Sequence, residues 1–195
     1  MTPKALQIIK DEHLTIAAVI YSLRYLVRQI RDHGAKPDFR LLYAILDYIV
    51  EYPDRFHHPK ENDYLFKILH EKNSDAHPII AELEAEHVRG NQLIDSLKTG
   101  LRRYEQDEQA GFDAFAKAVE EYADFQWQHM AKEESILMPM AEKSLSEKDW
   151  DVIAKAFQEN DNPLFGIKPK EQSELMFQKI LNLAPPPIGV GPAKR

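Results

Sequence analysis

The chain has 195 residues, 44% of them apolar, and a formal charge of −7 at pH 7, which suits one soluble globular domain with its own core. Its acidic balance lacks the basic footprint of proteins that bind nucleic acid or anionic membranes, so we expect neither partner. The absence of cysteine excludes disulfides and thiolate metal sites. Because there is no apolar leader and no run of about 18 apolar residues, we expect a cytoplasmic protein.

Apolar residues recur at alternating steps of three and four along four stretches, which predicts four long helices. The first ends at Gly34, because glycine suits this position and a proline follows three residues later. The second is expected to run from Asp38 to about Glu71 and to bend near its middle, where two prolines remove backbone donors. The third follows the turn at residues 73–75, and the fourth begins near Gly111.

Four long helices with short connections predict an all-α fold, an up-down-up-down antiparallel four-helix bundle over residues 1–145. Residues 146–195 form a C-terminal extension of different character. Ser146 to Asp149 resembles a capping box for a short helix, residues 160–163 break that helix, and another short helix is expected around Glu171 to Leu183 before a proline-rich tail. We expect the extension to pack on the bundle, although its apolar residues could equally form a homodimer contact or bind a protein partner.

Histidine and glutamate lie four residues apart on two of the predicted helices, as His57 with Glu61 and as His129 with Glu133. Residues at this spacing share one face of a helix, so each pair presents an imidazole and a carboxylate together. An earlier helix contributes a Glu-His dipeptide ahead of each pair. The two halves of the chain therefore look like a repeat, which would build a site with approximate twofold symmetry.

The histidines of the two dipeptides, His13 and His87, lie on the apolar stripes of the first and third helices. Counting residues to the intervening turns, at about 1.5 Å per residue, returns all four histidines to one level of the bundle. One histidine on an apolar stripe is more often a hydrogen-bonded core residue than a ligand. Four in one layer with two carboxylates favour metal coordination, and a satisfied polar core stays open as the alternative.

With these motifs the chain resembles the hemerythrin-like family, whose signature is His-His-Glu cation-binding helices, over about residues 3–145. The matching residues are His13, the run from Phe56 through His57, His58, Pro59 and Lys60 to Glu61 leading to Leu65 and Phe66, His87, and the run from His129 to Glu134 leading to Leu137, Met138 and Pro139. The resemblance implies a non-haem di-iron centre with two Fe ions and an oxo or hydroxo bridge, although manganese or zinc could occupy the same ligands. Carried over by position, the ligands are His13, His57, His87 and His129, with Glu61 and Glu133 as bridges.

One position departs from the family. Oxygen-carrying hemerythrins place a second histidine one helical turn from the third-helix ligand, where this chain has Leu83 and Asn91. Four histidines in place of five imply an open or water-filled position at both metals. The function implied is to bind or reduce a small oxidant such as dioxygen, nitric oxide or peroxide, as a sensor or in a stress response. An iron donor, a redox enzyme and a metal-free helical interaction module are the alternatives.

Other polar residues near these motifs have simpler interpretations. His58 is expected to be solvated, because successive residues of a regular helix point about 100° apart. Glu134 is expected at the surface. Gln126 and Tyr122, on the fourth stripe, are candidates to support the ligands or line a pocket. Gly90 could leave room for a small ligand or be an ordinary core position.

Overall fold

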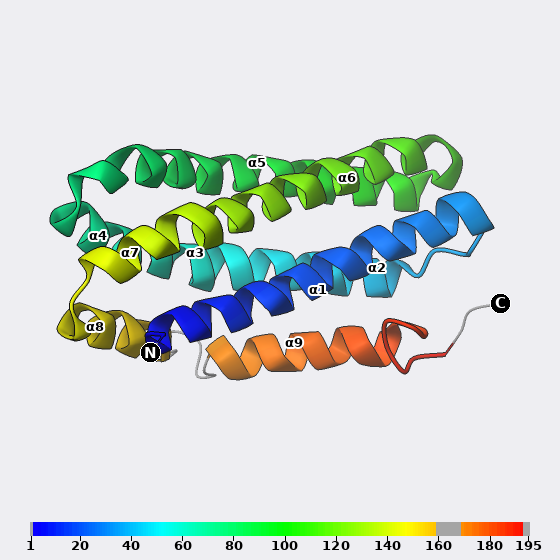
Figure 1. Cartoon of the computed structure of the whole chain (residues 1–195). Helices are drawn as coiled ribbons and strands as arrows, with labels where there is room; N and C mark the ends of the chain where they lie inside the picture. Colours follow the sequence, from blue (N-terminus) through cyan, green and yellow to red (C-terminus); the bar gives the residue numbers. More distant parts are fainter. Residues whose placement is uncertain (1, 159–168, 193–195) are drawn as a thin grey trace.

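The computed structural model of the chain describes residues 2–158 and 169–192, and the break expected at residues 160–163 lies outside them. Helices dominate this described part, which contains no strand, so the predicted all-α class is confirmed (Figure 1). The α-helices are α1 (Lys4–His33), α2 (Phe39–Ile49), α3 (His58–Lys60), α4 (Lys67–Lys72), α5 (His77–Gln106), α6 (Glu108–Lys132), α7 (Met138–Ser144), α8 (Glu147–Gln158) and α9 (Pro169–Leu183).

The helical run from α2 to α4 is continuous, as expected, but its two prolines coincide with a change of helix type. Two π-helical segments, Val50–His57 and Glu61–Phe66, flank α3, and Pro53 lies inside the first. A third π-helical segment, Glu133–Leu137, joins α6 to α7. A π-helix closes i→i+5 hydrogen bonds and therefore has wider turns, and such segments occur frequently at functional sites. Residues of the predicted metal site stand at an end of each segment.

The long helices pack in neighbouring pairs around a common core. Helix α1 contacts α2 and α6, and α5 contacts the same two helices. The buried apolar residues form two clusters, one containing Ile16 to Val27 of α1 and the other containing Ala5 to Ile9 of the same helix. Between the clusters lies a polar layer of buried side chains, which consists of His13, His57, His58, Glu61, His87, His129 and Glu133.

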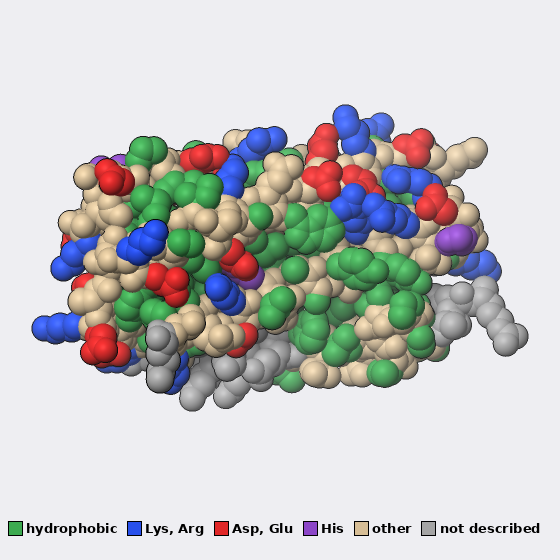
Figure 2. Space-filling view, viewed as in Figure 1, with side chains coloured by type: hydrophobic (Ala, Val, Ile, Leu, Met, Phe, Trp, Pro, Cys, Tyr) green, Lys and Arg blue, Asp and Glu red, His purple; other side chains and the backbone are tan. Residues whose placement is uncertain are grey.

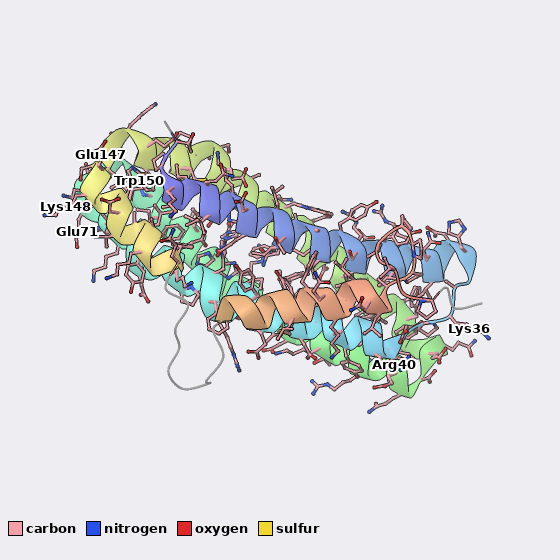
Figure 3. The ribbon with its side chains drawn as sticks, turned by 90° about the horizontal axis from the view of Figure 1, so that it is seen from below. Lys36, Arg40, Glu71, Glu147, Lys148 and Trp150 are labelled. Atoms are coloured by element: carbon pink, nitrogen blue, oxygen red, sulfur yellow. The ribbon has the colours of Figure 1, made fainter. Side chains whose placement is uncertain are left out.

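The C-terminal helices lie against the rest of the chain. Helix α8 contacts α1, and α9 runs alongside α2 in two perpendicular views (Figures 1 and 3). The capping box expected before α8 is present, because the Asp149 carboxylate accepts hydrogen bonds from the Ser146 amide and hydroxyl at 2.9 and 2.6 Å. Trp150 and Phe157 of α8 are buried in the cluster that contains the start of α1.

The surface carries both signs of charge. In Figure 2, acidic and basic side chains are interspersed and gather together over one end of the molecule. One link between α1 and α6 is the pairing of Arg24 with Glu120 and Asp124 at 2.5 and 3.2 Å. Among the described residues, no helix is long and apolar enough to cross a membrane.

The ends of the long helices follow local rules. Gly34 ends α1 in the left-handed conformation, with φ of 63°, as its position predicted. Helix α6 begins at Glu108, three residues before the expected Gly111, because the Asp107 side chain accepts a hydrogen bond from the Ala110 amide at 3.0 Å and caps the helix. Gly111 therefore lies inside the first turn of α6, where α5 approaches it closely.

We expect Gly111→Ala to lower the free energy of unfolding by about 1–3 kcal/mol, because a Cβ there would lie 2.4 Å from Tyr104 Cα and force α5 and α6 apart. The matched control is Gly90→Ala, whose Cβ would make ordinary contacts at 3.6 and 3.8 Å. Since alanine favours a helix over glycine, this control should gain about 0.4–1 kcal/mol. Urea denaturation of the cation-free protein measures both, and equal effects would contradict the close approach.

Candidate metal centre

The structure brings the six predicted site residues together in the polar layer. Helix α1 supplies His13 and α5 supplies His87, while the other four come from the two His-x-x-x-Glu motifs. All six side chains are at most 7% exposed. The count of residues along the helices predicted that these histidines lie at the same height in the bundle, and they do. The reason is that the two histidines on either side of each turn lie nearly the same number of residues from it.

The two oxygens of Glu61 face different histidines. Oε1 lies 3.2 Å from His57 Nε2 and 3.6 Å from His13 Nε2, whereas Oε2 lies 3.6 Å from His87 Nε2. One carboxylate thus spans two groups of imidazoles that belong to different halves of the chain.

Glu133 repeats this arrangement from the opposite side. Its Oε2 lies 3.3 Å from His13 Nε2, and its Oε1 lies 3.3 Å from His129 Nε2 and 3.9 Å from His87 Nε2. Each carboxylate therefore directs one oxygen toward the histidines of the first half and the other toward those of the second. Two carboxylates in this position are suited to bridge two cations.

The glutamates of the Glu-His dipeptides accept hydrogen bonds from the Nδ1 atoms of the histidines of the two motifs. His57 Nδ1 donates to Glu12 Oε2 at 2.7 Å, and His129 Nδ1 donates to Glu86 Oε2 at 3.0 Å. Lys132 pairs with the same Glu86 carboxylate. The sequence contained the signal for both glutamates in the repeated dipeptide, but only the fold shows that each serves the histidine of a different helix.

The remaining two histidines are held by the residue that follows the glutamate of each motif. His13 Nδ1 donates to Glu134 Oε1 at 2.9 Å, and His87 Nδ1 donates to Asn62 Oδ1 at 2.9 Å. Glu134 is exposed, as expected, and its carboxylate nevertheless accepts the hydrogen bond from His13. When these rings are neutral and carry their proton on Nδ1, each Nε2 keeps a lone pair that can bind a cation. His87 Nε2 and His129 Nε2 lie 3.1 Å apart, within hydrogen-bond distance.

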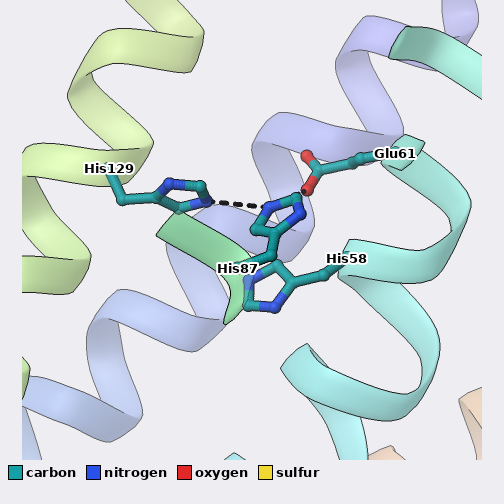
Figure 4. A group of neighbouring side chains, drawn as sticks. All are labelled: His58, Glu61, His87 and His129. Atoms are coloured by element: carbon teal, nitrogen blue, oxygen red, sulfur yellow. Dashed lines mark hydrogen bonds and ion pairs between the residues drawn. The ribbon is translucent and has the colours of Figure 1, made fainter. Parts of the chain in front are cut away.

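His58 differs from its prediction. It was expected to be solvated, yet it is 6% exposed and belongs to the polar layer. Its ring stacks on His87 with centroids 4.2 Å apart and meets His129 edge-on at 5.6 Å (Figure 4). The prediction assumed regular α-helical rotation, whereas a π-helical segment ends at His57 and another begins at Glu61. Leu83 is buried in an apolar cluster and Asn91 is exposed, so neither takes part in the layer.

Five ring and carboxylate atoms at the centre of this layer are buried without a hydrogen-bond partner: His13 Nε2 and both oxygens of Glu61 and of Glu133. Leaving such groups unsatisfied is costly, and most of all for charges. The unpaired atoms are nitrogen and carboxylate oxygen, which are the donors that iron, manganese and zinc take from proteins. Their types and their convergence fit bound cations.

The electrostatics show how strongly positive charge is favoured here. Burial lowers the pKa of His57, but Glu61 and Glu12 outweigh this effect and raise it to about 9. Burial likewise lowers the pKa of His13, and the surrounding carboxylates hold it well above its ordinary value. Burial raises the pKa of Glu61, yet the neighbouring histidines keep it well below its usual range.

Two groups of side chains have donor atoms close enough to share a cation. His13, His57 and Glu61 form one group, and Glu61, His87 and His129 form the other together with His58, with the atoms of each group within 4.8 Å of one another. Glu61 belongs to both groups. The layer can therefore accept two adjacent cations.

The other predicted neighbours lie close to this layer. Gln126 is buried and donates to the Tyr122 hydroxyl at 3.1 Å. A Cβ on Gly90 would meet Gln126 at 3.8 Å, so the space beside this glycine is already filled to ordinary contact. A cavity of about 500 Å³ opens elsewhere, on the side of Glu12, and its described lining includes Phe157. The Phe157 and His57 rings are nearly perpendicular, at 78°, with centroids 6.2 Å apart.

Comparison with known proteins identifies one related family. A family model described as the hemerythrin HHE cation-binding domain matches residues 4–141, which include all seven residues of the polar layer. No curated protein and no solved structure matches the chain.

The stability of the cation-free protein should fall as the pH rises through the titration of His57. Because its pKa is raised from 6.5 to about 9 on folding, its stabilising contribution is fully present below pH 6.5 and is lost by about pH 9. This loss is about 3 kcal/mol. Denaturant midpoints from pH 6 to 9.5 measure it, and His57→Gln should flatten the profile. An unchanged slope in this variant would contradict the assignment.

Proposed function

Since this chain belongs to the hemerythrin HHE cation-binding domain family, we propose that it is a non-haem di-iron protein that binds or reduces a small oxidant such as dioxygen, nitric oxide or peroxide. The observation that carries the proposal is the convergence of unpaired buried nitrogen and carboxylate atoms on one point of the core. Two redox-active cations held together would supply the electrons for such chemistry.

The proposed ligand set is supported by the distances between side chains. His13 and His57 would hold one cation, and His87 and His129 would hold the other. Glu61 and Glu133 lie between them, because each directs its two oxygens to different pairs of histidines. Bridging oxygens of this kind offset the repulsion between two adjacent cations.

The residues around the proposed ligands fix the orientation of the four histidine rings. Glu12, Glu86, Glu134 and Asn62 accept the Nδ1 protons of the four histidines, which fixes each ring and its tautomer. The apolar clusters on either side of the layer exclude bulk water, and a low local dielectric strengthens every interaction inside it.

We infer that the chain consists of a helical bundle and a C-terminal extension. Residues 1–145 form the up-down-up-down bundle that carries the site, which is supported by the contacts of α1 and α5 with both α2 and α6. Residues 146–195 are a separate C-terminal extension, and its described helices pack on the bundle, which is supported by the contacts of α8 with α1 and of α9 with α2.

The proposed function predicts about two irons per chain in freshly purified protein, measured by elemental analysis. Visible charge-transfer bands should shift on addition of azide or nitric oxide, since a small ligand must reach the site. Repeated consumption of oxidant in the presence of a reductant would identify an enzyme, and a single stoichiometric event would identify a binding or sensing protein. No metal and no bands after reconstitution with ferrous iron would leave a helical bundle with a polar core.

Within the same measurement, Glu61→Ala and Glu133→Ala should each release at least one iron per chain, because the remaining histidines cannot neutralise or bridge two cations. The matched control is Glu71→Ala, at an exposed position of α4 (Figure 3). Retention of both irons by either bridging variant would exclude its assignment.

A separate prediction concerns the hydrogen bonds that the glutamates of the Glu-His dipeptides accept from histidine Nδ1 atoms. Glu12→Ala and Glu86→Ala should each weaken iron binding about 10–100-fold, because His57 or His129 loses the acceptor that orients it. Glu82→Ala is the control, since Glu82 also pairs with Lys132 but has no contact with a histidine in the described structure. Competition with a chelator of known affinity measures all three. Equal affinities across the series would mean that ring orientation is fixed by packing alone.

A further inference from the structure

The cavity of about 500 Å³ beside Glu12 lies between the bundle and the C-terminal extension, and none of its described lining residues belongs to the polar layer. The lining comes from α1, from the run of α2 into the first π-helical segment, from the end of α8 and from α9. Figure 3 views the molecule from the side on which α8 and α9 pack on the bundle. The volume is within the usual range of sites that bind small molecules.

Aromatic rings make up most of the described apolar wall of this cavity. Tyr48 and Tyr52 come from the bundle, and Phe157 and Phe177 come from the extension. The centroid of the Tyr48 ring lies 5.6 Å from that of Tyr52 and 6.4 Å from that of Phe177. Because aromatic rings attract one another in offset and edge-on arrangements, the wall favours a flat aromatic molecule.

Two polar groups on the wall complement each other. Glu12 lines the cavity, and its Oε2 accepts the hydrogen bond from His57. The Tyr48 hydroxyl is buried without a hydrogen-bond partner, which is costly. Burial and the negative charge of Glu12 raise the pKa of Tyr48, so this hydroxyl keeps its proton and can donate. A single hydroxyl group on a bound molecule could accept from Tyr48 and donate to Glu12.

The charges around the cavity favour a neutral molecule. Its exposed lining includes one cation, Lys4, and one anion, Asp11. Deeper in, the Glu12 carboxylate is opposed by Lys60, whose ammonium lies over the Phe157 ring at 5.6 Å. Burial lowers the pKa of Lys60, and Glu12 opposes this shift, so the two groups are close enough to act on each other. A charged molecule would meet a charge of its own sign.

We propose that this cavity binds a small neutral phenol, whose ring packs among the four aromatic side chains and whose hydroxyl lies between Glu12 and Tyr48. The inference goes beyond the proposed function and does not require bound iron. The molecule would contact the glutamate that orients His57, so it would lie one side chain away from the proposed metal centre. Ordered water could satisfy the same two polar groups, but it would make no use of the aromatic wall.

The test is isothermal titration calorimetry of the cation-free full chain with 2-naphthol, a phenol that is uncharged at neutral pH. Binding should be saturable, with one molecule per chain. The comparison is 2-methoxynaphthalene, which keeps the rings and the oxygen but cannot donate to Glu12, so it should bind about tenfold more weakly. Equal affinities, or no binding of 2-naphthol, would overturn the proposal and leave a cavity that holds water only.

Replacing the Tyr48 hydroxyl shows whether the probe occupies this cavity. Tyr48→Phe keeps the ring, so 2-naphthol should bind about three- to tenfold more weakly, while the free protein should melt no lower than wild type because an unpaired buried hydroxyl is gone. The control is Tyr43→Phe, which should bind like wild type. The Tyr43 hydroxyl donates to Glu105 at 2.7 Å, and Tyr43 is not part of the described lining.

A second variant blocks the cavity. Thr15→Phe places a larger side chain at a partly exposed lining position of α1 and should abolish binding of 2-naphthol. Wild-type affinity in both Tyr48→Phe and Thr15→Phe would mean that the probe binds elsewhere and would overturn the proposal. If either variant does not fold, the two probes compared on the wild-type chain still decide. Uptake of two irons without binding of 2-naphthol would keep the proposed function and reject this inference alone.

Discussion

Two carboxylates buried in the middle of an apolar core are the constraint on which this structure depends. Glu61 and Glu133 lie where the helices meet, with a cluster of apolar side chains on either side of their layer. Charges in such a place must be balanced by cations or by protonated histidines, which explains the raised pKa of His57. Cations bound at its centre would therefore stabilise the core, and each half of the protein supplies a share of the buried histidines and glutamates.

The approximate twofold symmetry of the site extends beyond the ligands. In each half, the glutamate of the Glu-His dipeptide orients the histidine of the following motif, and the residue after the glutamate of that motif orients a histidine of the other half. The two halves are thus joined through hydrogen bonds, and Glu61 and Glu133 each lie near histidines of both halves. The symmetry ends at His58, which has no counterpart in the second half because position 130 is Met130.

The π-helical segments and the C-terminal helices give the site its particular surroundings. Both His57 and His58 are buried where the helix passes from one π-helical segment to the next around α3. On the outside of His57, Phe157 of α8 packs against the ring, and the Lys60 ammonium lies over the Phe157 ring at 5.6 Å. The C-terminal extension is therefore one contact away from a proposed ligand.

The sequence by itself determined the helices, the inward face of each and the level at which His13, His57, His87 and His129 meet, because helical periodicity and rise are nearly constant. It did not determine the position of His58 or the role of Glu134. Both depend on contacts between helices and on a local change of helix type, which residue spacing along one helix cannot show. The start of α6 was displaced for a simpler reason, since the Asp107 cap outweighed the glycine that follows. Only the tertiary structure decided which acceptor holds each histidine, because each acceptor comes from a different helix than the ring it orients.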